Sequence, residues 1–248
     1  MAKKNKISVS SVLVMLGILL IAVLLLSIGW ASYYSKFKVV KTPQMIGYNF
    51  DSFTDSVKMQ VEYQWIPVDS ISRNAVIALL AAEDKNFYVH DGFSPINESD
   101  TISIIPNKHE TITQKTAHSV FLTKGDSWTK NILEPYYTVL IEYLWGKDRI
   151  LEVYMNVMPV GKGIFGIEAA AQIYFDKKSA DLTKQEAAYI AALAESDEKM
   201  VSEEELISRQ KEIMTEMGLM MHVKIGKKPV DEQDVQPVKP VYKRKWRG

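Results

Sequence analysis

The sequence predicts a mostly α-helical protein that starts with one transmembrane helix. The segment Val9 to Ala31 carries no charge and is rich in Leu, Ile and Val. Its length is close to the roughly 20 residues that a helix needs to cross a bilayer. Farther along, apolar residues recur at helical spacing between Ser72 and Ala82. Two alanine-rich segments, Ile167 to Phe175 and Thr183 to Ala194, have the small side chains that let helices pack closely.

The composition fits a folded protein of one large domain or two small ones. The chain has 248 residues, of which 47% are apolar, so a sizeable core is available. It carries 30 basic and 30 acidic residues, and this balance argues against a nucleic-acid partner held by bulk electrostatics. It contains no cysteine, which excludes catalysis by a thiol and metal sites built from cysteine.

The N-terminal apolar segment has two interpretations. A cleavable signal peptide would have a shorter apolar core, of roughly 7–15 residues. A retained anchor would have aromatic residues at the membrane interface, where Trp30, Tyr33 and Tyr34 stand. We therefore expect residues 1–35 to form a cytoplasmic tip and a single-pass transmembrane anchor. The lysines before the segment favour a cytoplasmic N-terminus and those after it weaken this bias; they are Lys3, Lys4 and Lys6, then Lys36, Lys38 and Lys41.

The region after the anchor is predicted to change from a linker to helices. Residues 36–66 predict a stalk or linker, with a short strand between Val57 and Trp65, where apolar residues alternate. A helix over Ser72 to Ala82 follows. The segment Asp91 to Glu110 is rich in Ser, Asn, Asp and Pro, which predicts a mobile loop. The next helix is expected over Thr111 to Leu122.

The second half of the chain is predicted to be mainly helical. Leu133 to Trp145 has apolar residues around most of its circumference, which predicts a buried helix. Arg149 to Asn156 predicts another short helix. Thr183 should cap the helix that ends at Ala194, with Glu186 completing a capping box.

Two further segments have less regular patterns. Glycines 161, 163 and 166 are spaced as in dinucleotide-binding loops, but no suitable strand precedes them, so close helix packing is the favoured interpretation. We expect residues 196–226 to form a divergent helical C-terminal part, with the methionines from Met217 to Met221 in its packing face. Residues 227–248 are rich in proline and charge and predict a disordered basic tail.

Five motifs occur in the order in which one enzyme family carries them. They are Ala81-Ala82-Glu83-Asp84-x-x-Phe87-x-x-His90-x-Gly92; Thr111-Ile112-Thr113-Gln114 with Ala117 and Phe121-Leu122; Lys130 to Glu142; Ile150 to Asn156; and Gly163 to Phe175. The chain resembles the peptidoglycan glycosyltransferases, the family 51 transglycosylases, over about Pro67 to Ala194. We therefore assign a transglycosylase-like domain to residues 67–195. Since no transpeptidase module follows, the monofunctional biosynthetic transglycosylase type is the closer match.

The resemblance implies a lysozyme-like helical domain that polymerises lipid II into glycan strands and releases undecaprenyl pyrophosphate. It implies that Glu83 is the general base for a sugar hydroxyl, and that Glu134 helps to organise the pyrophosphate region. The implied substrate-binding residues are Thr111, Thr113, Gln114, Lys115, His118 and Lys130. The implied partners are lipid II, the growing glycan chain, the bacterial inner membrane and other cell-wall synthesis proteins, with the catalytic domain on the outer, periplasmic side.

Several of these residues have a structural alternative. Glu83 could be a solvated carboxylate after a helix; burial would raise its pKa, whereas nearby cations would lower it. Glu134 could cap a helix start, because Pro135 follows it and proline is tolerated at the first helical position. His90 and Gly92 are expected to hold the loop rather than to act in catalysis.

The chain departs from the family pattern at positions that are usually basic, which leaves two other functions open. His118 and Asn131 each stand where the family has a lysine, Asp126 replaces a basic residue, and the usual proline- and asparagine-containing segment is missing at Glu195 to Lys199. The alternatives are an inactive paralogue that binds lipid-linked glycan or scaffolds cell-wall enzymes, and a lysozyme-like hydrolase. We expect no cofactor; a divalent cation could assist, although no metal-ligand spacing is evident.

Overall fold

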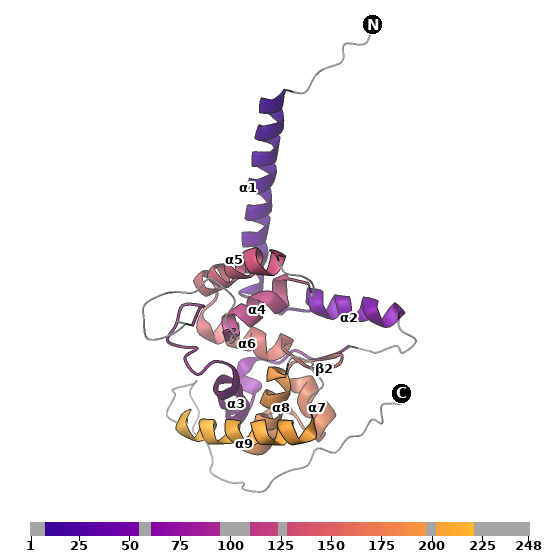
Figure 1. The fold of residues 1–248 in the computed structure, drawn as a ribbon, viewed down its shortest axis with the longest axis vertical. Coiled ribbons are helices and arrows are strands. Elements are labelled where there is room, and N and C mark those ends of the chain that lie inside the picture. Colours follow the sequence, from indigo (N-terminus) through magenta and orange to yellow (C-terminus); the bar gives the residue numbers. More distant parts are fainter. Residues whose placement is uncertain (1–7, 55–60, 95–109, 124–127, 197–201, 221–248) are drawn as a thin grey trace. The chain divides into compact units, whose positions relative to one another are not determined.

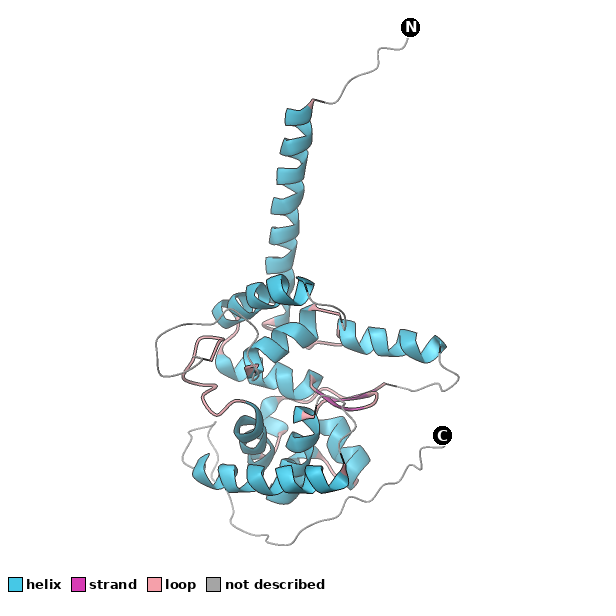
Figure 2. Ribbon diagram, in the orientation of Figure 1, coloured by secondary structure: helices cyan, strands magenta, loops and turns pink. Residues whose placement is uncertain are grey.

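The structure, a computed structural model, describes residues 8–54, 61–94, 110–123, 128–196 and 202–220. These form two compact units that divide after Phe37. Within the described ranges the secondary structure is predominantly helical, with three very short strands (Figure 1, Figure 2). The predicted mostly α-helical fold class is therefore confirmed.

The first unit is dominated by helix α1, Val9–Tyr34, which spans 26 residues. It is long and apolar enough to cross a membrane, judged by its length and composition. Its leucine, isoleucine and valine side chains are mostly exposed, as they would be in a helix surrounded by lipid. Near its C-terminal end, the rings of Tyr33 and Phe37 stack with their centroids 4.5 Å apart. The helix matches the predicted anchor segment.

The second unit has a helix near its start, where a stalk or linker was predicted, so the linker prediction is wrong for residues 43–54. Helix α2, Pro43–Thr54, packs on α4, Ile112–Phe121, and its Met45 is buried. Strand β1, Glu62–Tyr63, pairs in parallel with β3, Ile164–Phe165, which pairs antiparallel with β2, Pro159–Gly161. The hydroxyl of Tyr63 donates to the backbone carbonyl of Val39. The expected strand is confirmed only at residues 62–63, since 55–60 lie outside the described residues.

One packed group of helices contains α3, α8 and α9. Helix α3, Arg73–Glu83, begins after the cap Ser72 and packs against α8, Lys184–Glu195. The capping box predicted at the start of α8 is present. Helix α9, Glu203–Met220, packs against both through a buried stripe of Leu206, Ile213, Met217 and Met220. The predicted packing role of the methionine cluster is thus confirmed within α9, whereas Met221 and the predicted tail lie outside the described residues.

A second group contains α4, Ile112–Phe121, with α5, Trp128–Leu144, and α6, Lys147–Val157. Two expectations about α5 are wrong. The helix begins at Trp128, so Pro135 lies inside it and Glu134 does not cap its start. The helix is also not buried all round, because Ile132, Val139 and Tyr143 are 62%, 58% and 88% exposed. The apolar residues of this segment therefore lie on two faces of the helix, one packed against the protein and one exposed.

The glycine-rich stretch produces a close approach between backbones. Gly166 has φ +82°, and a Cβ atom there would lie 2.3 Å from the carbonyl oxygen of Asn156. The Asn156 side chain in turn holds the backbone of Ile66, accepting from its N–H and donating to its carbonyl at 2.8 Å each. Helix α7, Ile167–Phe175, starts at once after Gly166. These contacts support the packing interpretation of the glycines.

The 3₁₀ turns η1, Val68–Ser70, and η2, Ser179–Asp181, precede α3 and α8. The N–H of Ser72, the cap of α3, donates to the carbonyl of Ser179 in η2. The connection fixes the start of α3, and hence the direction in which its C-terminal Glu83 points.

Candidate active site

The central residue of the site is Glu83, the last residue of α3. Its side chain is only 2% exposed. One carboxylate oxygen accepts from the ammonium group of Lys115 on α4, and the other accepts from the hydroxyl of Tyr154 on α6 at 3.2 Å. The acid is thus held by three helices, which fix its orientation, and it is not a solvated carboxylate.

The pKa of Glu83 is raised above its ordinary value of 4.5. Burial is the largest cause, because it disfavours the charged form. The charge and the hydrogen bond of Lys115 oppose this effect, the charge of Glu195 adds to it, and the Tyr154 hydrogen bond opposes it slightly. Between the two effects that the sequence left open, burial is the stronger. A carboxylate with a raised pKa accepts a proton more readily, as a general base near neutral pH must.

Helix α4 connects Glu83 to the second predicted glutamate. Lys115 and His118 stand three residues apart on this helix, so they share one face. The Nδ1 atom of His118 lies 3.3 Å from a carboxylate oxygen of Glu134, a buried residue of α5. These two atoms are close enough for an ion pair but are not aligned for a hydrogen bond. The structure therefore brings both glutamates to α4, one through a lysine and the other through a histidine.

Two cavities border the pair of Lys115 and Glu83, since Lys115 lines the first and Glu83 lines the second. The first, of about 140 Å³, has a basic lining for most of its charged groups: Lys115, His118 and Lys130, with Glu110 as the acid. Lys130 pairs with Glu110 at 2.6 Å. The other residues that line this first cavity are Gln44, Ser119, Tyr154, Pro159 and Ala194. A second cavity, of about 250 Å³, is lined by Glu83 itself. The carboxylate is covered on most sides but still borders open space, and the adjoining cavity is not uniformly negative.

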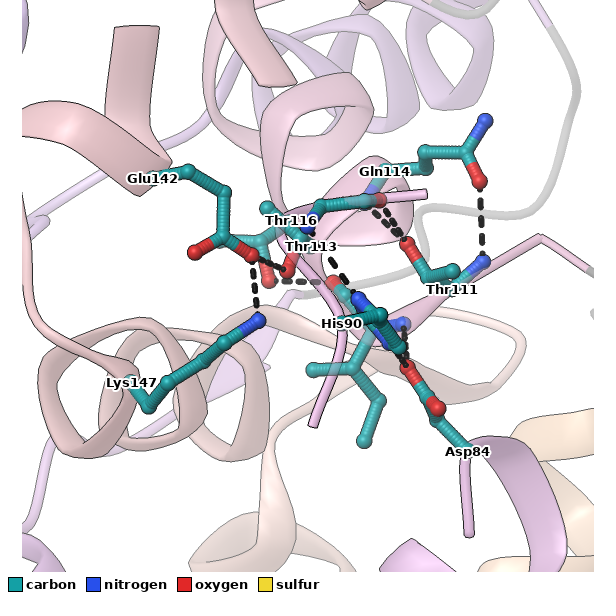
Figure 3. Close-up of polar contacts among 10 residues, drawn as sticks. Asp84, His90, Thr111, Thr113, Gln114, Thr116, Glu142 and Lys147 are labelled. Atoms are coloured by element: carbon teal, nitrogen blue, oxygen red, sulfur yellow. Dashed lines mark hydrogen bonds and ion pairs between the residues drawn. The ribbon is translucent and has the colours of Figure 1, made fainter. Parts of the chain in front are cut away.

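The loop after Glu83 is held by a buried hydrogen-bond network (Figure 3). Asp84 accepts from Nε2 of His90 at 2.8 Å and from the backbone N–H of Ile112 at 3.1 Å. The N–H of Gly92 donates to Nδ1 of His90 at 3.1 Å. Because Nδ1 accepts, it carries no proton, so His90 is the neutral tautomer with its proton on Nε2. This geometry supports the expected structural role of His90 and Gly92.

The three polar residues of the Thr-Ile-Thr-Gln motif fix the start of α4. Thr111 and Gln114 form a capping box, and the Thr111 hydroxyl also donates to the carbonyl of Gly92 at 2.6 Å. The Thr113 hydroxyl donates to Glu142 at 2.6 Å, and Lys147 pairs with the same carboxylate (Figure 3). Thr111 and Thr113 are buried. These contacts orient α4 and therefore Lys115; substrate contacts by the three residues stay a prediction.

Three residues at the site carry no prediction from the sequence. Tyr154 lies inside a recognised motif and donates to Glu83, so the motif itself was the signal that could have identified it. Glu195 and Arg209 line the cavity of Glu83. They come from α8 and α9, and their pairing depends on how these helices pack, which no local pattern reveals. Within the described ranges, no group of three or more His, Asp or Glu side chains is arranged to hold a metal ion.

Comparison with known proteins identifies the family to which this chain is similar. The model of the transglycosylase family matches residues 51–218, so the match continues through most of α9, beyond the predicted 67–195. The chain is 37% identical over 166 residues to the biosynthetic peptidoglycan transglycosylase of Pasteurella multocida, covering 63% of this chain and 65% of the relative. The Mannheimia succiniciproducens protein of that name is 44% identical over 140 residues, 54% of this chain and 57% of the relative. The biosynthetic peptidoglycan transglycosylase of Bacteroides thetaiotaomicron is 33% identical over 215 residues, which cover 83% of this chain and 87% of the relative.

Proposed function

The chain belongs to the transglycosylase family, and on this premise we propose that it is a membrane-anchored peptidoglycan glycosyltransferase. In this proposal it polymerises lipid II into glycan strands and releases undecaprenyl pyrophosphate. The observation that carries the proposal is the buried Glu83, with its raised pKa, joined through Lys115 to a cavity whose lining includes three basic residues and one acid. Lys115 then belongs both to the surroundings of the base and to the proposed anion site.

The proposed chemistry starts with proton transfer to Glu83. A hydroxyl of the acceptor sugar loses its proton to this carboxylate and attacks the anomeric carbon of the donor chain. A new glycosidic C–O bond forms, the bond to the pyrophosphate oxygen breaks, and the configuration inverts. General-base catalysis of this kind contributes roughly 10²–10⁴-fold. Tyr154 would hold the carboxylate toward the acceptor during this step.

The departing pyrophosphate needs cations beside it. Lys115, His118 and Lys130 line the cavity that adjoins Glu83, and hydrogen bonds from charged donors to phosphate are stronger than neutral ones. Lys115 would move from Glu83 toward the diphosphate as the carboxylate accepts its proton. We assign Glu134 the role of orienting His118, which its 3.3 Å contact supports. No organic cofactor is required because the substrates carry both nucleophile and leaving group, while a divalent cation could shield the diphosphate.

A lipid-linked substrate also requires a protein at the bilayer. Helix α1 is the proposed anchor, and the lysines that precede it favour a cytoplasmic N-terminus with the second unit outside, at the bacterial inner membrane. The exposed apolar side chains of α5, Ile132, Val139 and Tyr143, form a face suited to contact with lipid. Proposed partners are the growing glycan strand and other cell-wall synthesis proteins.

The proposal is tested by incubating the purified full chain with labelled lipid II. The wild type should produce polymer, and Glu83→Gln should produce none while still binding the substrate. Loss of the polymer in Glu83→Gln with intact binding supports the base role. Polymer of unchanged yield from Glu83→Gln would contradict it.

One observation favours a second function, the binding of lipid-linked glycan without turnover. Lys115 pairs with Glu83 and Lys130 pairs with Glu110, so acids compete with the substrate for these cavity lysines. That function predicts binding with no polymer from the wild type. Release of soluble fragments from mature glycan would instead indicate a lysozyme-like hydrolase.

A further inference from the structure

An arginine from the last described helix enters the cavity of Glu83 already paired with an acid. Arg209 of α9 donates through Nε to one oxygen of Glu195 at 2.6 Å and through Nη2 to the other at 3.0 Å. Its remaining nitrogen, Nη1, donates to Glu212 at 2.9 Å. Two parallel hydrogen bonds to one carboxylate give a well-defined geometry. Arg209 and Glu195 are both about one-third exposed, so the pair is reachable by solvent.

The position of this pair is set by the packing of α9. The amide of Gln210 donates to the carbonyl of Gln185 on α8 at 2.8 Å, and Glu216 pairs with Lys85 at 2.7 Å, two residues beyond Glu83. Helix α9 therefore bridges the end of α3 and the body of α8, and it carries Arg209 between them. Both members of the pair line the cavity that Glu83 borders.

We propose that Arg209 is a positioning residue of the reaction, because it holds and neutralises the carboxylate of Glu195 in the cavity of the catalytic base. This inference rests on the function proposed above. It assigns no substrate contact to Arg209, because each of the three guanidinium nitrogens already donates to Glu195 or Glu212.

The charges around Glu83 give this pair a defined effect. The groups that face or border Glu83 come from every packed element: Lys115 of α4, Tyr154 of α6, Glu195 of α8, Arg209 of α9, and Asp84, Lys85 and Glu110 of the adjoining loops. The charge of Glu195 raises the pKa of Glu83. An unneutralised Glu195 would raise it further, and the base would then stay protonated to a higher pH.

The sign of the expected effects follows from the requirement that Glu83 be deprotonated to act. Arg209→Met leaves Glu195 unopposed, so the acidic limb of the rate profile moves to higher pH. Glu195→Gln removes the repulsion, so the limb moves to lower pH. The double variant Arg209→Met/Glu195→Gln removes both charges and returns the limb close to its wild-type position. At a fixed pH on the limb, we expect about a tenfold loss for Arg209→Met, the scale of effect of one nearby charge.

The experiment is the pH dependence of lipid II polymerisation by the full chain and these three variants. Glu212→Gln is the matched control, because it removes an acid from the same arginine but lies outside the cavity lining and is 59% exposed. Its limb should stay at the wild-type pH. Thermal unfolding identifies variants that fail to fold. If Arg209→Met is one of them, the double variant decides whether the inference holds, because it also lacks Arg209 but carries no unopposed Glu195 charge.

Two results would overturn the inference. One is a double variant as impaired as Arg209→Met across the pH range, which would indicate that Arg209 contacts the substrate. The other is an acidic limb that does not move in either single variant. If the wild type makes no polymer, the proposed function fails, and the inference is then decided by a ¹³C NMR titration of the Glu83 carboxyl, identified by its absence in Glu83→Gln. Opposite displacements in the two single variants support it, and unchanged titration refutes it.

Discussion

At the scale of single residues, the site depends on keeping Glu83 in an environment that penalises its charge. Lys115 and Tyr154 compensate only in part, so the pKa stays raised. The folded protein therefore holds the Glu83 proton more tightly than the unfolded chain does. A residue placed in this way contributes to function at the expense of stability.

This placement predicts that Glu83→Gln stabilises the fold at neutral pH. Because the folded-state pKa is the higher one, the wild type loses unfolding free energy as the pH rises through 4.5 toward that pKa. The glutamine variant avoids this loss, so the two should have similar stability at acidic pH and diverge above it. Chemical denaturation at a series of pH values measures the difference. Glu203→Gln, an exposed change on α9, should follow the wild type; equal slopes for Glu83→Gln and the wild type would contradict the account.

A second residue-scale prediction concerns Asp84. Asp84→Ala leaves the proton on Nε2 of His90 and the N–H of Ile112 without their acceptor in a buried network. Each buried group left unsatisfied costs about 1–3 kcal/mol, so the unfolding free energy should fall by that order. The neighbouring exposed acid offers the control, Asp91→Ala, for which no comparable loss is expected. A loss no larger than that of the control would show that the network contributes little.

At the scale of elements, the close approach at the start of α7 is set by Gly166. Gly166→Ala places a Cβ atom 2.3 Å from the carbonyl oxygen of Asn156 and forces alanine to adopt φ +82°. The left-handed backbone alone costs roughly 1–2 kcal/mol. We expect a clear drop in melting temperature, measured by circular dichroism, whereas Gly146→Ala meets no atom within 4 Å and should cause a much smaller change. Equal melting temperatures for the two variants would be inconsistent with the packing described.

Elements with strong local signals could be predicted from the sequence. The helices predicted over Ser72 to Ala82 and Thr111 to Leu122 are present as α3 and α4. The cap predicted at Thr183 begins α8, because capping depends on residues within one turn. The start of α5 could not be predicted, since Pro135 is tolerated inside the helix. Helix α2 was missed because its burial comes from contact with α4, which is distant in the sequence.

The same division applies to the candidate site. Glu83 and Lys115 lie in or next to motifs, and the sequence placed them in one site. The contact between His118 and Glu134 and the pair of Glu195 with Arg209 depend on helices that meet only after folding. The sequence could not predict whether burial or Lys115 has the stronger effect on the pKa of Glu83, because the burial of this side chain depends on how the helices pack.

At the scale of the whole molecule, the proposed function requires that the second unit act at the surface of a bilayer. A helix surface inside a soluble fold rarely leaves several large apolar side chains exposed together. The face of α5 that carries Ile132, Val139 and Tyr143 does so. Contact with lipid would remove this surface from water, with the favourable free energy that apolar burial brings.

This surface predicts a direct contact between α5 and lipid. The chain has no cysteine, so Tyr143→Cys can be labelled uniquely with a fluorophore in the full chain reconstituted in vesicles. Brominated lipids should quench this label strongly. Leu219→Cys on α9 provides the comparison, because Leu219 is also highly exposed, at 80%, but belongs to a helix with a mainly charged surface. Similar weak quenching at both sites would exclude the proposed contact.

The most direct test of the central claim is the rate of lipid II polymerisation by the full chain measured across pH. If Glu83 is the base and its proton affinity is raised by burial, activity falls on acidification through one protonation above pH 4.5, and Glu83→Gln loses roughly 10²–10⁴-fold in rate at every pH. A rate that stays flat through this range, or polymer made by the glutamine variant at the wild-type rate, would contradict the claim.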